Sequence, residues 1–272
     1  MTVMDLRASA CVALAATLLT MGAAFAADPL PEEEVPVASS DWVVQVTPYM
    51  WAAGMRGDIS PFRAAPTIHV EKSFGDVMED FNMGGFLNIW ARRDDIVFSG
   101  DMMYVNTSSA KSTRVLPDLF PGGLEVSGEL DSIEFNATAQ IGYRLVDTPD
   151  FTFDALAGGR YWYISNEVTI RTDLLGSISR KEQFNWIDPV IGARAFYNIT
   201  DQFSLLAQAD IGGFGAGSDL TWSVLGTLNY TINDHWTVSA GYKHLAVDYR
   251  KNDYVFDVNL SGPVLGVTYR FH

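Results

Sequence analysis

Hydrophobic and polar residues alternate one by one along most of this chain from Trp42 onward. In the segment 133–145, IEFNATAQIGYRL, apolar residues hold the odd positions and polar residues hold most even positions. The segments 42–51, 151–162 and 222–232 show the same alternation. Successive side chains of a strand point to opposite faces of its sheet, so a period of two predicts strands with one apolar face. The sequence therefore predicts an all-β fold.

Two architectures fit this alternation. A soluble β-sandwich turns its apolar faces inward, whereas a transmembrane barrel turns them toward lipid and keeps its polar faces inside. The alternating segments run well beyond the roughly 5–6 residues of an ordinary globular strand, and isolated charges of both signs lie on the polar face. Aromatic residues gather toward the segment ends, as in a membrane girdle: Tyr143, Phe151, Tyr197, Phe203, Tyr230, Trp236, Tyr269 and Phe271. We expect a closed antiparallel transmembrane β-barrel; a soluble periplasmic β-sandwich that acts as a binding protein is the alternative.

Breaks in the alternation give the strand count. Short polar breaks, which predict tight periplasmic turns, occur at 92–95, 147–150, 200–202 and 233–235. Longer breaks, which predict outer loops, occur near 55–80, 108–122, 171–181, 214–219 and 250–253. Four turns and five loops join about ten strands, with both termini on the periplasmic side. Eight or twelve strands also fit, because 65–73 has the pattern of one more strand.

The first outer loop contains a segment with a different period, SFGDVMEDF. Its apolar residues fall three and four positions apart, with Ser73 at an N-cap position and Asp76 three residues later. This spacing predicts a short helix. Such a helix either folds over or into the barrel mouth, or is a loop turn that packs its own side chains.

The N-terminal segment does not belong to the barrel. Residues 8–26 are apolar or small and end in Ala24-Phe25-Ala26, which predicts a secretory signal peptide over 1–26 with cleavage after Ala26. Residues 27–41 are acidic and proline-rich and predict a disordered periplasmic tether. The barrel then spans 42–272, where no apolar run approaches the roughly 18 residues that a membrane helix needs.

Charge and cysteine content narrow the chemistry. The formal net charge of −15 argues against a nucleic-acid partner, because binding phosphate requires a basic surface. Cys11, the single cysteine, lies in the predicted signal peptide, so the mature chain has no disulfide and no thiol chemistry.

The run TPYMWAAGMRGD, followed by SFGDVMEDF and GGFLNIWARRDDIVFSGDMMYV, resembles a family of uncharacterised Gram-negative outer-membrane β-barrel proteins. The likeness covers roughly 42–105 and includes Asp101 and Tyr104 on the third strand. The segment after the leader is similar to the tether of small proteins of the OmpA-like, porin-like β-barrel superfamily. The resemblance implies location in the cell outer membrane, with outer-membrane lipid and lipopolysaccharide as surroundings. It brings no catalytic residues.

The expected inward face carries charges of both signs. We interpret them as a salt-bridge and hydrogen-bond network that fills a narrow barrel, because an unpaired buried charge is costly; the alternative is a pathway for small polar solutes. Strand pairing across the predicted turns brings Arg144 opposite Asp154 and Arg194 near Gln208. The candidate residues are Asp101, Glu134, Arg144, Asp154, Arg160, Asp188, Arg194, Asp210 and Lys243, with Arg92 and Arg270 as further bases.

Nothing in the sequence predicts catalysis, a metal site or a cofactor. The histidines are His69, His235, His244 and His272, and none forms a catalytic motif or a metal-ligand spacing. A barrel-mouth protease is the enzyme alternative, and it needs His69 or His244 beside Asp219 or Asp253.

The C-terminus completes the prediction. In the final strand Leu265, Val267, Tyr269 and Phe271 share one face, with Thr268 and Arg270 on the other. Closure requires this strand, 254–271, to pair with 42–54. Tyr269 and Phe271 also resemble the signal by which the barrel assembly machinery recognises its clients, although here His272 follows the phenylalanine. We expect an outer-membrane barrel with a structural or narrow-pore role and no catalysis.

Overall fold

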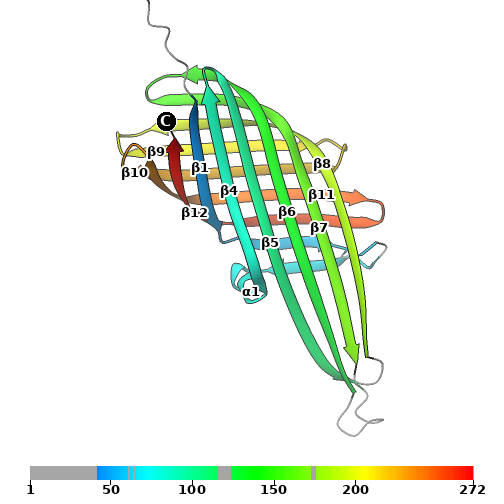
Figure 1. Ribbon diagram of the computed structural model, residues 1–272. Helices are drawn as coiled ribbons and strands as arrows, with labels where there is room; N and C mark the ends of the chain where they lie inside the picture. The colour runs from blue at the N-terminus through cyan, green and yellow to red at the C-terminus, as the bar shows by residue number, and fades with distance from the viewer. Residues whose placement is uncertain (1–41, 61, 64, 116–123, 173–175, 272) are drawn as a thin grey trace, which may run out of the picture. The chain divides into compact units, whose positions relative to one another are not determined.

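The computed structural model describes residues 42–60, 62, 63, 65–115, 124–172 and 176–271. The predicted signal peptide and tether lie outside these residues. The described chain forms an antiparallel sheet that closes into a barrel (Figure 1), as the alternation predicted. Its ten strands follow the ring in this order: β1 (Val43–Trp51), β4 (Phe81–Arg93), β5 (Ile96–Val115), β6 (Leu124–Asp147), β7 (Phe151–Thr172), β8 (Gly176–Asn198), β9 (Phe203–Gly213), β10 (Leu220–Thr231), β11 (Trp236–Lys251) and β12 (Tyr254–Phe271).

The first and last strands close the ring. β1 pairs antiparallel with β12, with Val44 opposite Phe271 and Trp51 opposite Val264. The predicted closure is confirmed. In a membrane it leaves no unpaired strand edge, which would expose backbone donors and acceptors to lipid at several kcal/mol each.

Two further strands and a helix lie outside the ring. β2 (Gly54–Ile59) continues the line of β1 along β12, and β3 (Ile68–Lys72) pairs with β2. The extra strand expected within 65–73 therefore exists, and the barrel still has ten strands. The helix α1 (Phe74–Glu79) begins with the capping box that the sequence predicted, formed by Ser73 and Asp76. None of its residues is buried, so it does not plug the barrel. No helix in the described part of the chain is long and apolar enough to cross a membrane.

The short turns lie where the sequence predicted them. They join β4 to β5, β6 to β7, β8 to β9 and β10 to β11, all at one end of the barrel, which we call the turn end. At the opposite end, the loop end, Asn252 and Asp253 join β11 to β12 with φ angles of 55° and 65°. Two consecutive left-handed residues form the type I′ turn that a two-residue hairpin favours, and short polar side chains tolerate them best.

Two predicted outer loops are largely strand. β5 continues to Val115 and β7 to Thr172, so most of 108–115 and 176–181 pairs with a neighbouring strand. Figure 1 shows β5 to β8 extending far beyond the other strands. The prediction was wrong there; along β7 and β8, for example, the polar and apolar faces exchange, which interrupts the alternation.

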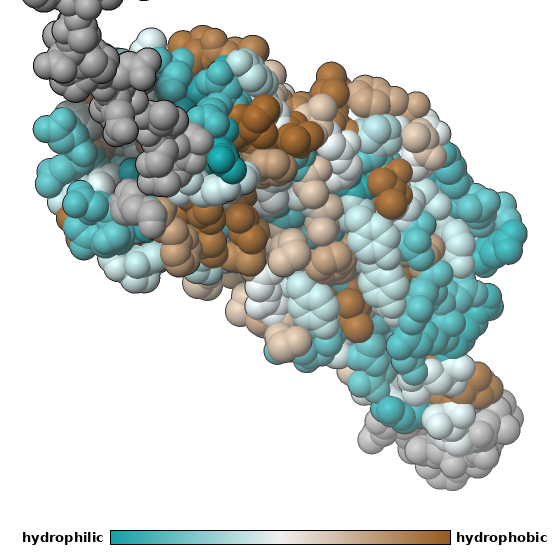
Figure 2. Space-filling view, turned by 45° about the horizontal axis from the view of Figure 1, so that its top comes forward, coloured by the Kyte–Doolittle hydropathy of each residue, from teal (hydrophilic) through white to brown (hydrophobic). Residues whose placement is uncertain are grey.

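β12 shows this exchange. Toward the turn end, Leu265 and Val267 face outward with 62% and 43% of their surface exposed. Toward the loop end, Asn259 is on the outward face, whereas Phe256 and Val258 are buried inside. Hydrophobic residues cover a broad area of the surface, with hydrophilic residues toward both ends (Figure 2). The turn-end part of the wall therefore suits lipid, and the loop-end part suits water.

Candidate functional site: the barrel lumen

The lumen has three levels along the barrel axis. A cavity lies at the turn end, a belt of paired charges lies above it, and a cluster of aromatic and aliphatic side chains fills the loop end. The first two levels consist of the polar inward positions of the strands, and the third consists of the inward positions beyond the exchange of faces.

The aromatic cluster closes the loop end. Trp162 stacks on Trp186 with ring centroids 5.5 Å apart, and Trp186 stacks on Tyr249 at 4.0 Å. Phe184 and Phe256 pack against the same rings. These side chains come from β7, β8, β11 and β12, so they span the barrel from opposite walls. The rings are buried and pack against one another across the loop end of the barrel.

The charge belt contains two buried ion pairs below that cluster. Arg160 donates to Asp210 at 2.7 Å and also to hydroxyl groups of Thr138 and Thr221. Lys243 donates to Asp101 at 2.6 Å, and the Tyr49 hydroxyl donates to the same carboxylate at 3.1 Å. Each charge is therefore paired and hydrogen-bonded, as burial requires.

A third pair lies nearer the turn end. The Arg144 guanidinium donates to both oxygens of Asp154, at 2.7 and 3.3 Å. Strand register places Asp154 opposite Arg194 as well, on β8. Arg144 also contacts Asp147, which accepts from Arg92 at the rim.

Besides Arg194, two of the predicted network residues make no ion pair among the described contacts. Asp188 instead accepts the Trp186 indole N–H at 3.0 Å and the Ser218 backbone N–H at 2.6 Å, so it fastens the loop between β9 and β10. Glu134 lies on β6 opposite Val105 and Ile164, away from the belt. Alternation placed both residues on the inward face but could not assign their partners.

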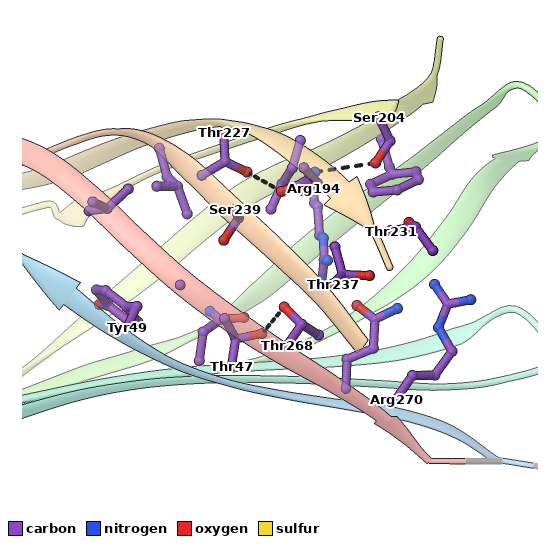
Figure 3. A pocket seen from close by; sticks show the side chains of 18 of the residues that line it. Thr47, Tyr49, Arg194, Ser204, Thr227, Thr231, Thr237, Ser239, Thr268 and Arg270 are labelled. Atoms are coloured by element: carbon purple, nitrogen blue, oxygen red, sulfur yellow. Dashed lines mark hydrogen bonds between the residues drawn. The ribbon is translucent and has the colours of Figure 1, made fainter. Parts of the chain in front are cut away.

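The turn-end cavity is lined mainly by hydroxyl and amide side chains, with Arg194 and Arg270 as its bases (Figure 3) and Asp101, the partner of Lys243, as its acid. It leaves about 80 Å³ for the centres of water molecules. One water needs roughly 10–15 Å³ by this measure, so the cavity holds several waters or one small solute. A second cavity in the charge belt leaves about 20 Å³, enough for one or two waters.

Sequence reasoning missed the residues that define the cavity. Its wall includes Thr47, Thr227, Thr231, Thr237 and Thr268. Alternation placed several of these on the polar face, but a hydroxyl on a strand carries no signal that it lines a cavity. Only the closure of the ring brings β1, β8, β10, β11 and β12 around one space.

The histidines do not form the predicted protease arrangement. His69 contacts Asp58 at 2.8 Å on the exposed β2–β3 hairpin. His244 contacts Ser261 and lies against the Trp222 ring on the outward face. Neither contact includes Asp219 or Asp253. No cluster of metal-ligating side chains occurs in the described residues.

No family model and no curated protein matches the chain. Among solved structures, the outer membrane protease OmpT from Escherichia coli is similar at a TM-score of 0.50 and 13% identity, covering 86% of this chain and 98% of that chain. The chain has the fold of an outer-membrane β-barrel protein. The translocator domain of the autotransporter NalP from Neisseria meningitidis gives a TM-score of 0.46 at 14% identity, covering 85% of this chain and 88% of that one. Identity this low shows the fold alone.

Proposed function

We propose that this protein is an integral protein of the outer membrane whose closed lumen gives it a structural role, without catalysis and without a continuous pore. Its turn end faces the periplasm, and the extended strands β5 to β8 rise above the outer leaflet. The exposed apolar area between two polar ends supports membrane insertion. The short turns at one end and the long extensions at the other support this orientation. Signal-peptide cleavage after Ala26 and assembly by the barrel machinery are parts of the same proposal.

The aromatic cluster is the observation that carries the structural role. A diffusion pore needs a water-filled path along the whole axis, and Trp162, Trp186 and Tyr249 stack across that path. The narrow-pore role for small polar solutes is the competing function. It requires the cluster to open.

Membrane location is tested with outer-membrane fractions of expressing cells. A folded barrel in detergent keeps its shape unless it is boiled, so boiled and unboiled samples should migrate differently on a gel. A chain found in the soluble periplasm, with the same mobility in both samples, would refute the membrane proposal.

Conduction is tested in planar bilayers. The wild-type protein should give no stable steps, whereas the double variant Trp162→Ala and Trp186→Ala should conduct, because it removes the stacked rings. Trp236→Ala, an exposed tryptophan at the turn end, is the matched control and should stay silent. Stable ohmic conductance of the wild-type protein would establish the pore role instead.

The absence of catalysis is tested with peptide substrates. Folded protein in detergent should leave a mixture of peptides intact. Cleavage that disappears on His69→Ala, the histidine paired with Asp58, would establish the enzyme alternative.

A further inference from the structure

Several buried hydrogen-bond donors on inward-facing strand residues have no acceptor. Their buried side-chain atoms without a partner, among the described residues, are all nitrogen atoms: Trp90 Nε1, Asn136 Nδ2, Gln140 Nε2, Trp162 Nε1 and Arg194 Nη1. Buried donors are almost always satisfied in native proteins, so each unmet donor requires an explanation. Asn136 and Gln140 line the second cavity, and among these residues only Arg194 lines the turn-end cavity. The unpaired atoms of Arg194 and Trp90 can only donate hydrogen bonds, so each of them requires an acceptor.

Arg194 has an unpaired donor and also carries a positive charge that no ion pair neutralises among the described contacts. Only 8% of its surface is exposed, and its guanidinium lies 4.8 Å from the centre of the Trp90 ring. Asp154 lies opposite both Arg194 and Arg144, and its described hydrogen bonds are to Arg144 alone. With Arg92 and Asp147 included, three arginines face two aspartates. One positive charge in excess remains beside the cavity.

Arg194 meets the turn-end cavity through other atoms of its side chain, because Nη1 itself has less than 1 Å² of exposed surface. This side chain lines the turn-end cavity, and in Figure 3 it projects among the hydroxyl groups of the wall without a hydrogen bond to any residue drawn. The lining continues to the rim, where Arg270 is exposed. A guanidinium pairs best with the two oxygens of a carboxylate or phosphate, and surrounding hydroxyl groups donate to the remaining oxygens.

We propose that the turn-end cavity binds one small oxyanion, a phosphate or a carboxylate, with Arg194 as its anchor. The site goes beyond the structural role of the barrel and does not depend on which way the barrel faces. Arg194→Gln keeps a donor of similar shape, removes the charge and leaves the Arg144–Asp154 pair intact.

Binding is measured on the full mature chain folded in detergent. Equilibrium dialysis with radiolabelled inorganic phosphate, at constant ionic strength, should give saturable binding of about one phosphate per chain. A parallel titration with radiolabelled acetate distinguishes the two oxyanions, and the tighter of the two identifies the ligand class. Arg194→Gln should abolish binding, whereas Arg171→Gln, an exposed arginine outside the lumen, should bind as the wild type does.

Unfolding provides a second measurement in case the variant is altered in structure. Phosphate should raise the urea midpoint of the wild type with a saturable dose dependence. Arg194→Gln should show only the general salt effect, which does not saturate and is common to all variants. In anion-free buffer this variant should unfold at the same or a higher urea concentration, because an unpaired buried charge has been removed. No saturable binding to the wild type, or equal binding to Arg194→Gln, would overturn the proposal.

Discussion

Asp154 lies between two arginines but bonds to only one of them, and the energetic consequence of this difference can be measured. It is the strand neighbour of Arg144 on β6 and of Arg194 on β8. Its carboxylate bonds to Arg144 through two contacts, and the two side chains are 2% and 7% exposed. If Arg144 is removed, Arg194, which lies opposite Asp154, can donate hydrogen bonds to the carboxylate in its place. If Asp154 is lost, Arg144 keeps only the partly exposed Asp147, and Arg194 loses the carboxylate opposite it.

The expected losses follow from this geometry. Asp154→Asn should lower the free energy of unfolding by about 3–5 kcal/mol, the usual cost of breaking a buried ion pair from one side. Arg144→Met should cost about 1–3 kcal/mol, because a replacement partner limits the unmet hydrogen bonding. The double variant should cost less than the two losses added together, by at least about 1 kcal/mol, because the side chains interact directly.

The assay is a urea titration of protein folded in detergent, followed by tryptophan fluorescence and by gel mobility without boiling. Arg171→Met removes one side of the exposed Arg171–Glu129 pair and serves as the control; it should cost less than about 1 kcal/mol. Equal losses for Asp154→Asn and Arg144→Met would show that Arg194 does not substitute. Strictly additive losses in the double variant would refute the pairing itself.

Three further predictions concern the wall and its two ends. Gly158→Ala should cost about 1–3 kcal/mol in the same titration, because its Cβ would lie 2.0 Å from a backbone oxygen, whereas Gly226→Ala meets nothing within 4 Å and should be tolerated. The backbone N–H of Arg63 donates to Glu182 at 2.7 Å and lowers the pKa of that carboxyl below 4.5. This link is therefore complete above about pH 4.5 and is lost as the pH falls through the lower folded pKa. The protection of the Arg63 amide, measured relative to the intrinsic exchange rate at each pH, should fall at acid pH and, in Glu182→Gln, at neutral pH as well. Deletion of 269–272 should abolish assembly into the outer membrane, which fractionation detects, and normal assembly of that variant would show that the pairing of β12 with β1 is dispensable.

The sequence by itself determined the wall of the barrel. A period of two in side-chain direction is a local property of a strand, so alternation identified the strands, and polar breaks placed the short turns. The capping box of α1 is also local, since Ser73 and Asp76 are three residues apart. The apolar final strand implied closure, because a barrel edge in lipid must be paired.

Only the tertiary structure decided what fills the barrel. Alternation put Arg160 and Asp210 on the inward face, but their strands lie apart in the sequence and meet only across the closed ring. The exchange of faces near Trp162 and Trp186 depends on the height along the barrel at which the wall leaves the lipid. Neighbouring residues in the sequence carry no information about that height. The unmet donor of Arg194 likewise follows from three strands that converge on Asp154, whose described hydrogen bonds are to Arg144.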